Sequence, residues 1–302
     1  MASYQFETVD VFTDRQFGGN PLAVFTDARG LSEREMQALA AEFNLSETTF
    51  VLPPAAPDNT ARVRIFNRTA EMPFAGHPSI GTGYVLARLG RAKAGILNLE
   101  VPAGLVRVDI ETDNAGTVIG GVVSAPQPLT IDEEIPPGTV AACVGLDPAD
   151  IVLAEHPPLL ASVGNPFIIA QVTDDALRRC VPNVGAFRTA VAARPAMNGR
   201  FALHLYARSG PRLRARMFAP LSGTVEDPAT GSANAPLGAL LLSLGGEDEA
   251  SFEIRQGEEM GRPSLLLVGA KRTNDGIRAT VAGRCVPVLR GEALLGDDGL
   301  RA

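Results

Sequence analysis

Apolar residues along the chain alternate with polar ones or form short runs, and glycine, proline and aspartate separate these stretches. A period of two is typical of strands, and the separating residues are typical of turns. The predicted strands cover residues 4–12, 22–27, 48–53, 61–66 and 97–102 in the first half, and 166–172, 201–207, 213–219 and 264–270 in the second. Each half of the chain is therefore expected to be largely a sheet.

Three stretches have a helical pattern instead. Residues 31–43 form an amphipathic helix that Ser32 and Glu35 begin as a capping box. Residues 78–90 and 232–246 are apolar on nearly all sides, which is unusual for a helix on a surface. Each of these two is expected to be a central helix with a sheet wrapped around it, with Pro236 in the first turns or at a kink and Gly90 at a helix end.

The chain repeats itself, which indicates that one architectural unit is used twice. Three matches occur in the same order, at offsets of 145, 152 and 150 residues: "GNPLAVFTDA" from Gly19 with "GNPFIIAQVTDDA" from Gly164, "VRIFNR" from Val63 with "ARMFAP" from Ala215, and "GHPSIGTGYVLARLG" from Gly76 with "EDPATGSANAPLGALLL" from Glu226. A boundary falls near residues 115–130, where turn-forming residues collect. The predicted lobes are residues 1–122 and 123–302, with a last strand that crosses back to the first lobe.

The expected fold class is α+β, with two pseudo-symmetric lobes, each a barrel-like, mostly antiparallel sheet around a central helix. Equivalent points of such lobes face each other across a cleft, the usual place for a small-molecule site. The 150-residue offset puts His77 opposite Asp227, and Gly81 and Thr82 opposite Gly231 and Ser232. Free N–H groups at two helix starts are suited to an anionic substrate.

Titratable residues at these points suit the transfer of a proton, which needs a base, an acid and a group that stabilises the intermediate anion. Asp227 and His77 are candidates, and so is Glu47, which lies between a helix and a strand among apolar neighbours that raise the pKa of a carboxyl. Each has a structural alternative: an exposed loop carboxylate for Glu47, a core histidine for His77, an N-cap for Asp227. Asn20 in "GGNP" is either a binding residue or part of a turn.

Composition excludes other classes of protein. The 302 residues are 45% hydrophobic, enough for a substantial core, and the formal charge of −7 is spread without a basic patch, so a nucleic-acid partner is not expected. No apolar run is long enough for a membrane span and no signal peptide is recognisable, so we expect a cytoplasmic protein.

Metal and cofactor sites are not expected either. The three cysteines are far apart among apolar residues, the three histidines lack ligand spacing, and neither of the two lysines lies in an apolar pocket sequence suited to a pyridoxal Schiff base. "GHPSIGTG" does not have the glycine spacing of a dinucleotide-binding loop, and a G-x-S-x-G elbow is absent from the sequence.

Five blocks together resemble the signature blocks of the phenazine-biosynthesis-like PhzF family, from Val9 to about Gly283: "VDVFTDRQFGGNPLAVF", "LSETTFVLP", "EMPFAGHPSIGTGYVL", "MFAPLSGTVEDPATGSAN" and "IRQGEEMGRPSLLLV". The resemblance implies the diaminopimelate epimerase fold and a cofactor-independent isomerase that forms a homodimer. It also implies that Glu47 carries a proton between substrate carbons, and that His77 and Asp227 orient the substrate and assist.

The same resemblance places Asn20, Gly76 and Ser232 along the cleft, and Gly231 lies in the same block. Related epimerases carry thiols at the helix starts, and neither helix-start block of this chain contains cysteine, which disfavours a two-thiol mechanism. The leading hypothesis is an isomerase that moves a proton on a small carboxylate-bearing substrate. Two alternatives stay open: an epimerase or racemase of an amino or hydroxy acid, and a non-catalytic metabolite-binding protein.

Overall fold

The computed structural model describes residues 2–209 and 212–296. The strands are β1 Ala2–Val11, β2 Asn20–Phe25, β3 Glu47–Leu52, β4 Ala61–Phe66, β5 Glu71–Met72, β6 Ile96–Val101, β7 Gly104–Thr112, β8 Val118–Ser124, β9 Thr130–Glu134, β10 Ile151–Val152, β11 Leu159–Ser162, β12 Pro166–Val172, β13 Leu203–Ser209, β14 Arg212–Ala219, β15 Thr224–Asp227, β16 Glu249–Gln256, β17 Ser264–Thr273 and β18 Gly276–Leu295. The helices are α1 Glu33–Phe43, α2 Gly76–Arg88, α3 Pro137–Val144, α4 Asp174–Arg179, α5 Val184–Ala192 and α6 Gly231–Leu244.

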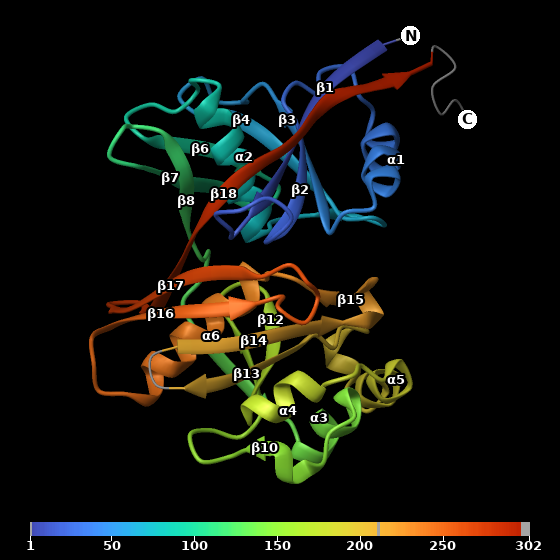
Figure 1. Ribbon diagram of the computed structural model, residues 1–302, viewed down its shortest axis with the longest axis vertical. Helices are drawn as coiled ribbons and strands as arrows, with labels where there is room; N and C mark the ends of the chain where they lie inside the picture. Colours follow the sequence, from blue (N-terminus) through green and yellow to red (C-terminus); the bar gives the residue numbers. More distant parts are fainter. Residues whose placement is uncertain (1, 210–211, 297–302) are drawn as a thin grey trace. The chain divides into compact units, whose positions relative to one another are not determined.

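The chain forms two compact units. Unit 1 comprises Met1–Ser124 and Ala282–Ala302, and unit 2 comprises Ala125–Val281. Strand β18 begins in unit 2 and ends in unit 1, where it pairs with β1 along the whole length of β1 (Figure 1). No helix among residues 2–209 and 212–296 is both long and apolar enough to cross a membrane.

The strands of unit 1 close into a ring of eight around α2 (Figure 1). The order is β1, β2, β3, β4, β6, β7, β8 and β18, and β18 pairs again with β1. Residues Gly76 to Leu86 of α2 are all buried. Glycine lets the helix approach the sheet, since a Cβ on Gly83 would lie 2.8 Å from Val108 Cγ1. The expectation of an apolar central helix is confirmed.

Alternation along β3 decides which side chains face this central helix. Phe50 and Leu52 point outward and pack with α1, which Ser32 caps as the sequence predicts. Residues Glu47 and Thr49 have the opposite orientation. The Thr49 hydroxyl lies 2.8 Å from the Thr82 hydroxyl of α2, so this second face looks into the barrel.

Unit 2 repeats the same plan. Strand β12 runs parallel to β13, β13 antiparallel to β14, β14 parallel to β16, and β16 antiparallel to β17, and α6 packs on these strands. Nearly all of α6 is buried, and Pro236 lies in its second turn, where its missing N–H leaves the Ser232 carbonyl without the usual helical donor. Helices α3, α4 and α5 cover the outer face of this sheet through an apolar cluster. The sequence pattern did not predict these three short helices.

The structure corrects the register of the third repeat. In unit 1 Arg64 binds Glu71 just before α2, and in unit 2 Arg216 binds Glu226 just before α6. Around the helix starts, each residue of unit 1 has its counterpart in unit 2 155 positions later in the sequence, not 150. The matched pairs are Glu71 with Glu226, Gly76 with Gly231, and Gly83 with Gly238. Gly238 approaches Val268 as Gly83 approaches Val108, which fixes the same register inside the helix.

This register changes the equivalences drawn from the sequence. The counterpart of His77 is Ser232, not Asp227, and the counterpart of Gly76 is Gly231. Asp227 corresponds to Met72, because the strands before the two helices pair in the same way. The two units therefore share a scaffold but carry different polar groups at equivalent points.

Candidate functional site

In unit 1, the carboxyl group of Glu47 lies next to the imidazole of His77. Glu47 is the first residue of β3 and points into the barrel, and His77 is the second residue of α2. The Glu47 Oε2 and His77 Nε2 atoms are 3.4 Å apart, and the two side chains are 15% and 6% exposed. Glu47 is therefore a largely buried carboxylate next to an imidazole, not an exposed loop residue.

Burial keeps His77 neutral, because its desolvation lowers the pKa of the imidazole from 6.5 to about 3. The contact with Glu47 is accordingly a close polar contact, not an ion pair, between a neutral ring and a carboxyl group over the ordinary pH range. A neutral imidazole carries one proton, and with that proton on Nε2 it faces Glu47 as a donor. His77 is thus placed next to the Glu47 carboxylate as a potential donor that does not take a proton from it.

We expect His77 to show no titration between pH 8 and 5. Its lowered pKa means that the unfolded chain binds a proton below about pH 6.5 and the folded chain does not, so stability falls as the pH drops from about 6.5 towards about 3. Ring-carbon NMR shifts of His77 measure the titration, with His77→Gln as the assignment control. The His77→Gln protein should lose stability less steeply over that range. An imidazole that titrates near pH 6.5 contradicts this expectation.

The start of α2 has N–H groups suited to an anion. The N-cap residue is Ala75, which has no side-chain oxygen to accept a hydrogen bond. The N–H groups of Gly76 and His77 come first in the helix, and Pro78 follows without one. A helix start without a side-chain cap binds carboxylate or phosphate groups readily.

Asn20 lies on the same inner face of the barrel. It begins β2, where it pairs with Val11, and it is fully buried. The preceding Gly19 has a φ of +61°, and a Cβ there would lie 2.3 Å from the Val11 carbonyl oxygen, so only glycine fits. Because β2 and β3 are parallel with Leu22 opposite Glu47, Asn20 and Glu47 lie at the same end of the barrel.

In unit 2, Asp227 ends β15 and is 6% exposed. It is not the N-cap of α6, because that position belongs to Thr230. The Thr230 hydroxyl donates to Asp227 Oδ2 at 2.5 Å, so it does not cap the helix either. Gly231 and Ser232 are the first two residues of α6, and no side chain of the described residues caps their helix start.

Sequence reasoning assigned no role to four buried polar residues around Asp227, although three of them lie in quoted blocks. They are Thr230, Asn234, Gln256 and His204. A polar residue inside an apolar helix or strand is the signal that points to such a network, since a buried polar group needs a partner.

Burial keeps the three thiols of the described residues protonated. Cys143, Cys180 and Cys285 are buried, and burial raises the pKa of the Cys143 thiol to about 11 and that of Cys180 to about 12. Burial also raises the pKa of Cys285. Within residues 2–209 and 212–296, no group of three or more His, Cys, Asp or Glu side chains is arranged to hold a metal ion.

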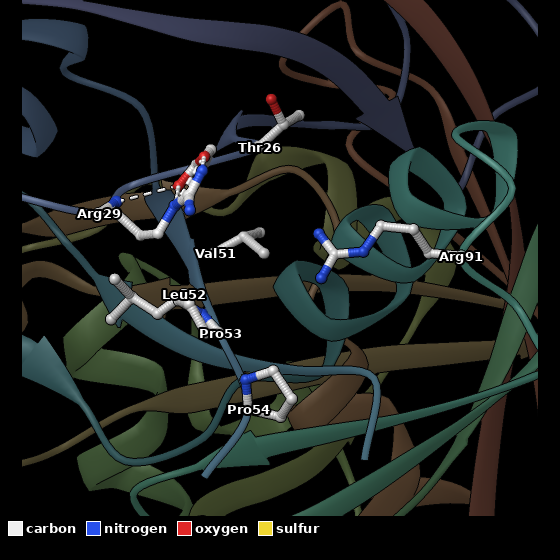
Figure 2. Close-up of a pocket in the computed structure, with 8 residues that line it drawn as sticks. Thr26, Arg29, Val51, Leu52, Pro53, Pro54 and Arg91 are labelled. Carbon is white, nitrogen blue, oxygen red and sulfur yellow. Dashed lines mark hydrogen bonds and ion pairs between the residues drawn. The ribbon is translucent and has the colours of Figure 1, made fainter. Parts of the chain in front are cut away.

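A pocket of about 310 Å³ opens at the other end of unit 1, beyond the carboxyl ends of β2, β3 and α2. Figure 2 shows Arg29 and Arg91 on opposite sides of Val51. The Arg29 guanidinium binds Asp27, and this hydrogen bonding holds the pKa of the Asp27 carboxyl below its usual value. Glu47 lies at the opposite end of β3, so this pocket does not contain the candidate site.

Comparison with known proteins places these residues in a family. The sequence profile of the phenazine biosynthesis-like proteins (PhzC-PhzF) matches residues 9–291. The chain belongs to this family. Among its PhzF relatives, the trans-2,3-dihydro-3-hydroxyanthranilate isomerase of Pseudomonas fluorescens is 36% identical over 299 residues, covering 97% of this chain and 100% of the relative. Curated relatives at this similarity are named isomerases, and this PhzF-family chain is an isomerase.

Solved structures agree on the fold. The PhzF-family phenazine biosynthesis protein of Bacillus anthracis superposes with a TM-score of 0.87 at 25% identity, covering 98% of this chain and all of the other. A hydroxyproline epimerase from Agrobacterium vitis superposes with a TM-score of 0.65 at 15% identity, covering 98% and 94% of the two chains. The second likeness concerns the fold alone. The predicted diaminopimelate epimerase-like class of this PhzF-family protein is confirmed.

Proposed function

We propose that this PhzF-family isomerase moves a proton between two carbons of a small carboxylate-bearing substrate, without a cofactor, and that Glu47 is the general acid and base. The observation that carries the proposal is the 3.4 Å contact between the Glu47 carboxylate and the buried imidazole of His77. A largely desolvated carboxylate with a neutral donor beside it is suited to accept a proton from carbon and to return it.

The proposed reaction balances with protein groups alone. Glu47 removes a proton from one carbon, the electron pair of that C–H bond moves into the conjugated system of the substrate, and the Glu47 carboxyl group, whose proton exchanges with solvent, delivers a proton to another carbon. No electrons are gained or lost overall. The N–H groups of Gly76 and His77 at the start of α2 are suited to stabilise the negative charge or the substrate carboxylate.

His77 serves this reaction as a neutral donor. The low pKa of the imidazole prevents it from taking the proton that Glu47 carries. Asn20, on the same inner face, is assigned to substrate binding. Asp227 is assigned to orienting the substrate and assisting catalysis, and Gly231 and Ser232, at the start of α6, are assigned to substrate binding.

The register of the repeat favours an isomerase over a symmetric two-base epimerase. The counterpart of Glu47 in unit 2 is Ala202, because β2 and β3 pair as β12 and β13 do. The counterpart of Asp227 in unit 1 is Met72. The repeat therefore does not supply two matching bases at equivalent points, as a mechanism with one base on each face of a stereocentre would use.

NMR spectroscopy in D2O tests the proposed function. The purified protein is incubated with trans-2,3-dihydro-3-hydroxyanthranilate, with trans-4-hydroxy-L-proline and with L-proline. Migration of a double bond with deuterium at a new carbon supports the proposal. Deuterium at one stereocentre with inversion supports an epimerase instead, and binding without exchange across the panel supports a metabolite-binding protein.

The proposal extends to a homodimer in the cytoplasm. Light scattering on the purified protein measures the dimer, and a mass of one chain of 31.7 kDa at micromolar concentration contradicts it.

A further inference from the structure

Five buried polar side chains form a continuous hydrogen-bonded chain in unit 2. They are His204 of β13, Asn234 of α6, Gln256 of β16, Thr230 at the N-cap of α6, and Asp227 of β15, with exposures of 0, 0, 1, 8 and 6%. The successive contacts are 3.1 Å from His204 to Asn234, 2.8 Å from Asn234 to Gln256, 3.1 Å from Gln256 to Thr230, and 2.5 Å from Thr230 to Asp227.

Backbone groups determine the orientation of Gln256. Its Oε1 accepts from the Thr230 backbone N–H at 3.2 Å, and its Nε2 donates to the Asp227 carbonyl oxygen at 2.8 Å. A backbone N–H only donates and a carbonyl oxygen only accepts, so the amide cannot be turned round. Gln256 Nε2 also donates to the Thr230 hydroxyl oxygen, and the hydroxyl proton is therefore directed to Asp227.

The same logic continues to His204. Asn234 Nδ2 donates to Gln256 Oε1 and to the Thr230 carbonyl oxygen at 3.0 Å, so Asn234 Oδ1 is the acceptor that faces the histidine. His204 must then carry its proton on Nε2. Its buried Nδ1 has no hydrogen-bond partner among the described residues. Every donor along the chain, from His204 through Asn234, Gln256 and Thr230, points towards Asp227.

We propose that Thr230, Gln256, Asn234 and His204 are positioning residues that hold the Asp227 carboxylate in one orientation as a hydrogen-bond acceptor. The inference rests on the proposed function through the role given to Asp227. Hydrogen bonds in a chain with a single direction polarise one another, and the last one, to a carboxylate, is the strongest kind. The Thr230 hydroxyl thereby fixes the position of Asp227 Oδ2 before a substrate binds.

Unit 1 shows that the fold itself does not require this series of hydrogen-bonded side chains. The residues 155 positions earlier occupy the equivalent places, as the matching strand pairs and helix starts show, and they are Thr49, Met72, Ala75, Ser79 and Val101. Three of these are apolar, and the central helix of unit 1 is buried as completely. Buried polar groups cost stability unless every one is satisfied, so a network confined to the unit that carries Asp227 indicates a role in presenting that carboxylate.

The substrate-free test is NMR of the protein labelled with 15N-histidine. We expect His204 as the Nε2–H tautomer, with a bare Nδ1, and His204→Gln identifies its resonance. Asp227→Asn and Thr230→Val should shift the His204 Nε2–H proton upfield, although neither residue contacts His204. Thr230→Ser keeps the hydroxyl and should leave the resonance in place.

Thr82→Val is the matched control, because it removes a buried hydroxyl pair of the same kind in unit 1. It should lower the thermal midpoint about as much as Thr230→Val and leave the His204 resonance unchanged. An Nδ1–H tautomer, or a resonance that does not respond to Asp227→Asn or Thr230→Val, overturns the proposal.

Steady-state kinetics, measured with the substrate that the D2O experiment identifies, distinguish a positioning role of Thr230 from a role in packing alone. Thr230→Val should lower kcat about tenfold with KM within about threefold of the wild type, and Thr230→Ser and Thr82→Val should stay near the wild type. A normal kcat for Thr230→Val overturns the proposal. If the wild type turns over no substrate, the proposed function is wrong, and so is the role of these hydrogen-bonded residues in presenting Asp227 to a substrate. The NMR result still decides whether the directed series of hydrogen bonds exists.

Discussion

Replacing Glu47 by glutamine is expected to lower kcat by about 10²- to 10⁴-fold, the usual contribution of a general acid or base. Glutamine has nearly the same shape and keeps an oxygen next to His77 Nε2, so substrate binding and thermal stability should change little. Turnover followed by proton NMR gives kcat and KM, and deuterium exchange from D2O measures the proton-transfer step alone.

Two variants make this result specific. Glu42→Gln removes an exposed carboxylate of α1 and should leave turnover unchanged. Glu47→Asp keeps the charge but withdraws the carboxylate, so it should retain more activity than Glu47→Gln and less than the wild type. If Glu47→Gln turns over substrate at the wild-type rate, the proton is carried by another group and the proposed role of Glu47 is wrong.

Replacing Arg216 by methionine should be the most destabilising of the substitutions considered, with a loss of about 3–5 kcal/mol of unfolding free energy. Arg216 and Glu226 have side chains only 7% and 14% exposed, and Arg216 Nη1 also donates to the carbonyl oxygens of Leu177 and Cys180 at the end of α4. Methionine leaves the Glu226 carboxylate buried without its partner. Urea unfolding followed by circular dichroism measures the loss.

The repeat supplies a control for this loss. Arg64 binds Glu71 in the same way in unit 1, but these side chains are 21% and 27% exposed. Water reaches that pair more easily, so Arg64→Met should be clearly less destabilising than Arg216→Met. The double variant Arg216→Met with Glu226→Met should recover part of the loss, because it removes the orphaned charge. Equal losses for the two arginine variants would show that burial does not decide the cost.

Much of this fold is predictable from the sequence, because alternation and apolar helices are local patterns. The capping box at Ser32 and the two apolar helices are confirmed. Helices α3, α4 and α5 were missed because they are short, six to nine residues each. Too few turns fit into such lengths for an apolar period to stand out, and packing on the sheet stabilises them instead.

The sequence predicts which types of residue belong to the candidate site better than it predicts how these residues are arranged. Matching His77 with Asp227 aligned two similar helix sequences, "GHPSIGTG" and "EDPATGSA", by their small residues. The pairing of each arginine with its glutamate, which fixes the true register, is a contact between strands and leaves little trace in a local match. The directed chain from His204 to Asp227 likewise joins four separate elements of the fold. Its successive members are 30, 22, 26 and 3 residues apart, so a pattern read along the sequence does not bring most of them together.

The path of β18 has a consequence for biosynthesis. This strand is the last of those in the described residues, yet it pairs with β1, the first of them, from Ala2 with Leu295 to Val11 with Cys285. It also pairs with β8, so the ring of unit 1 closes only after the residues of β18 have been synthesised. Until then β1 and β8 each present an unpaired edge, the feature by which sheets aggregate. A nascent chain that stops before residue 282 therefore lacks the strand that closes the ring of unit 1, and we expect its open sheet edges to make it prone to aggregation.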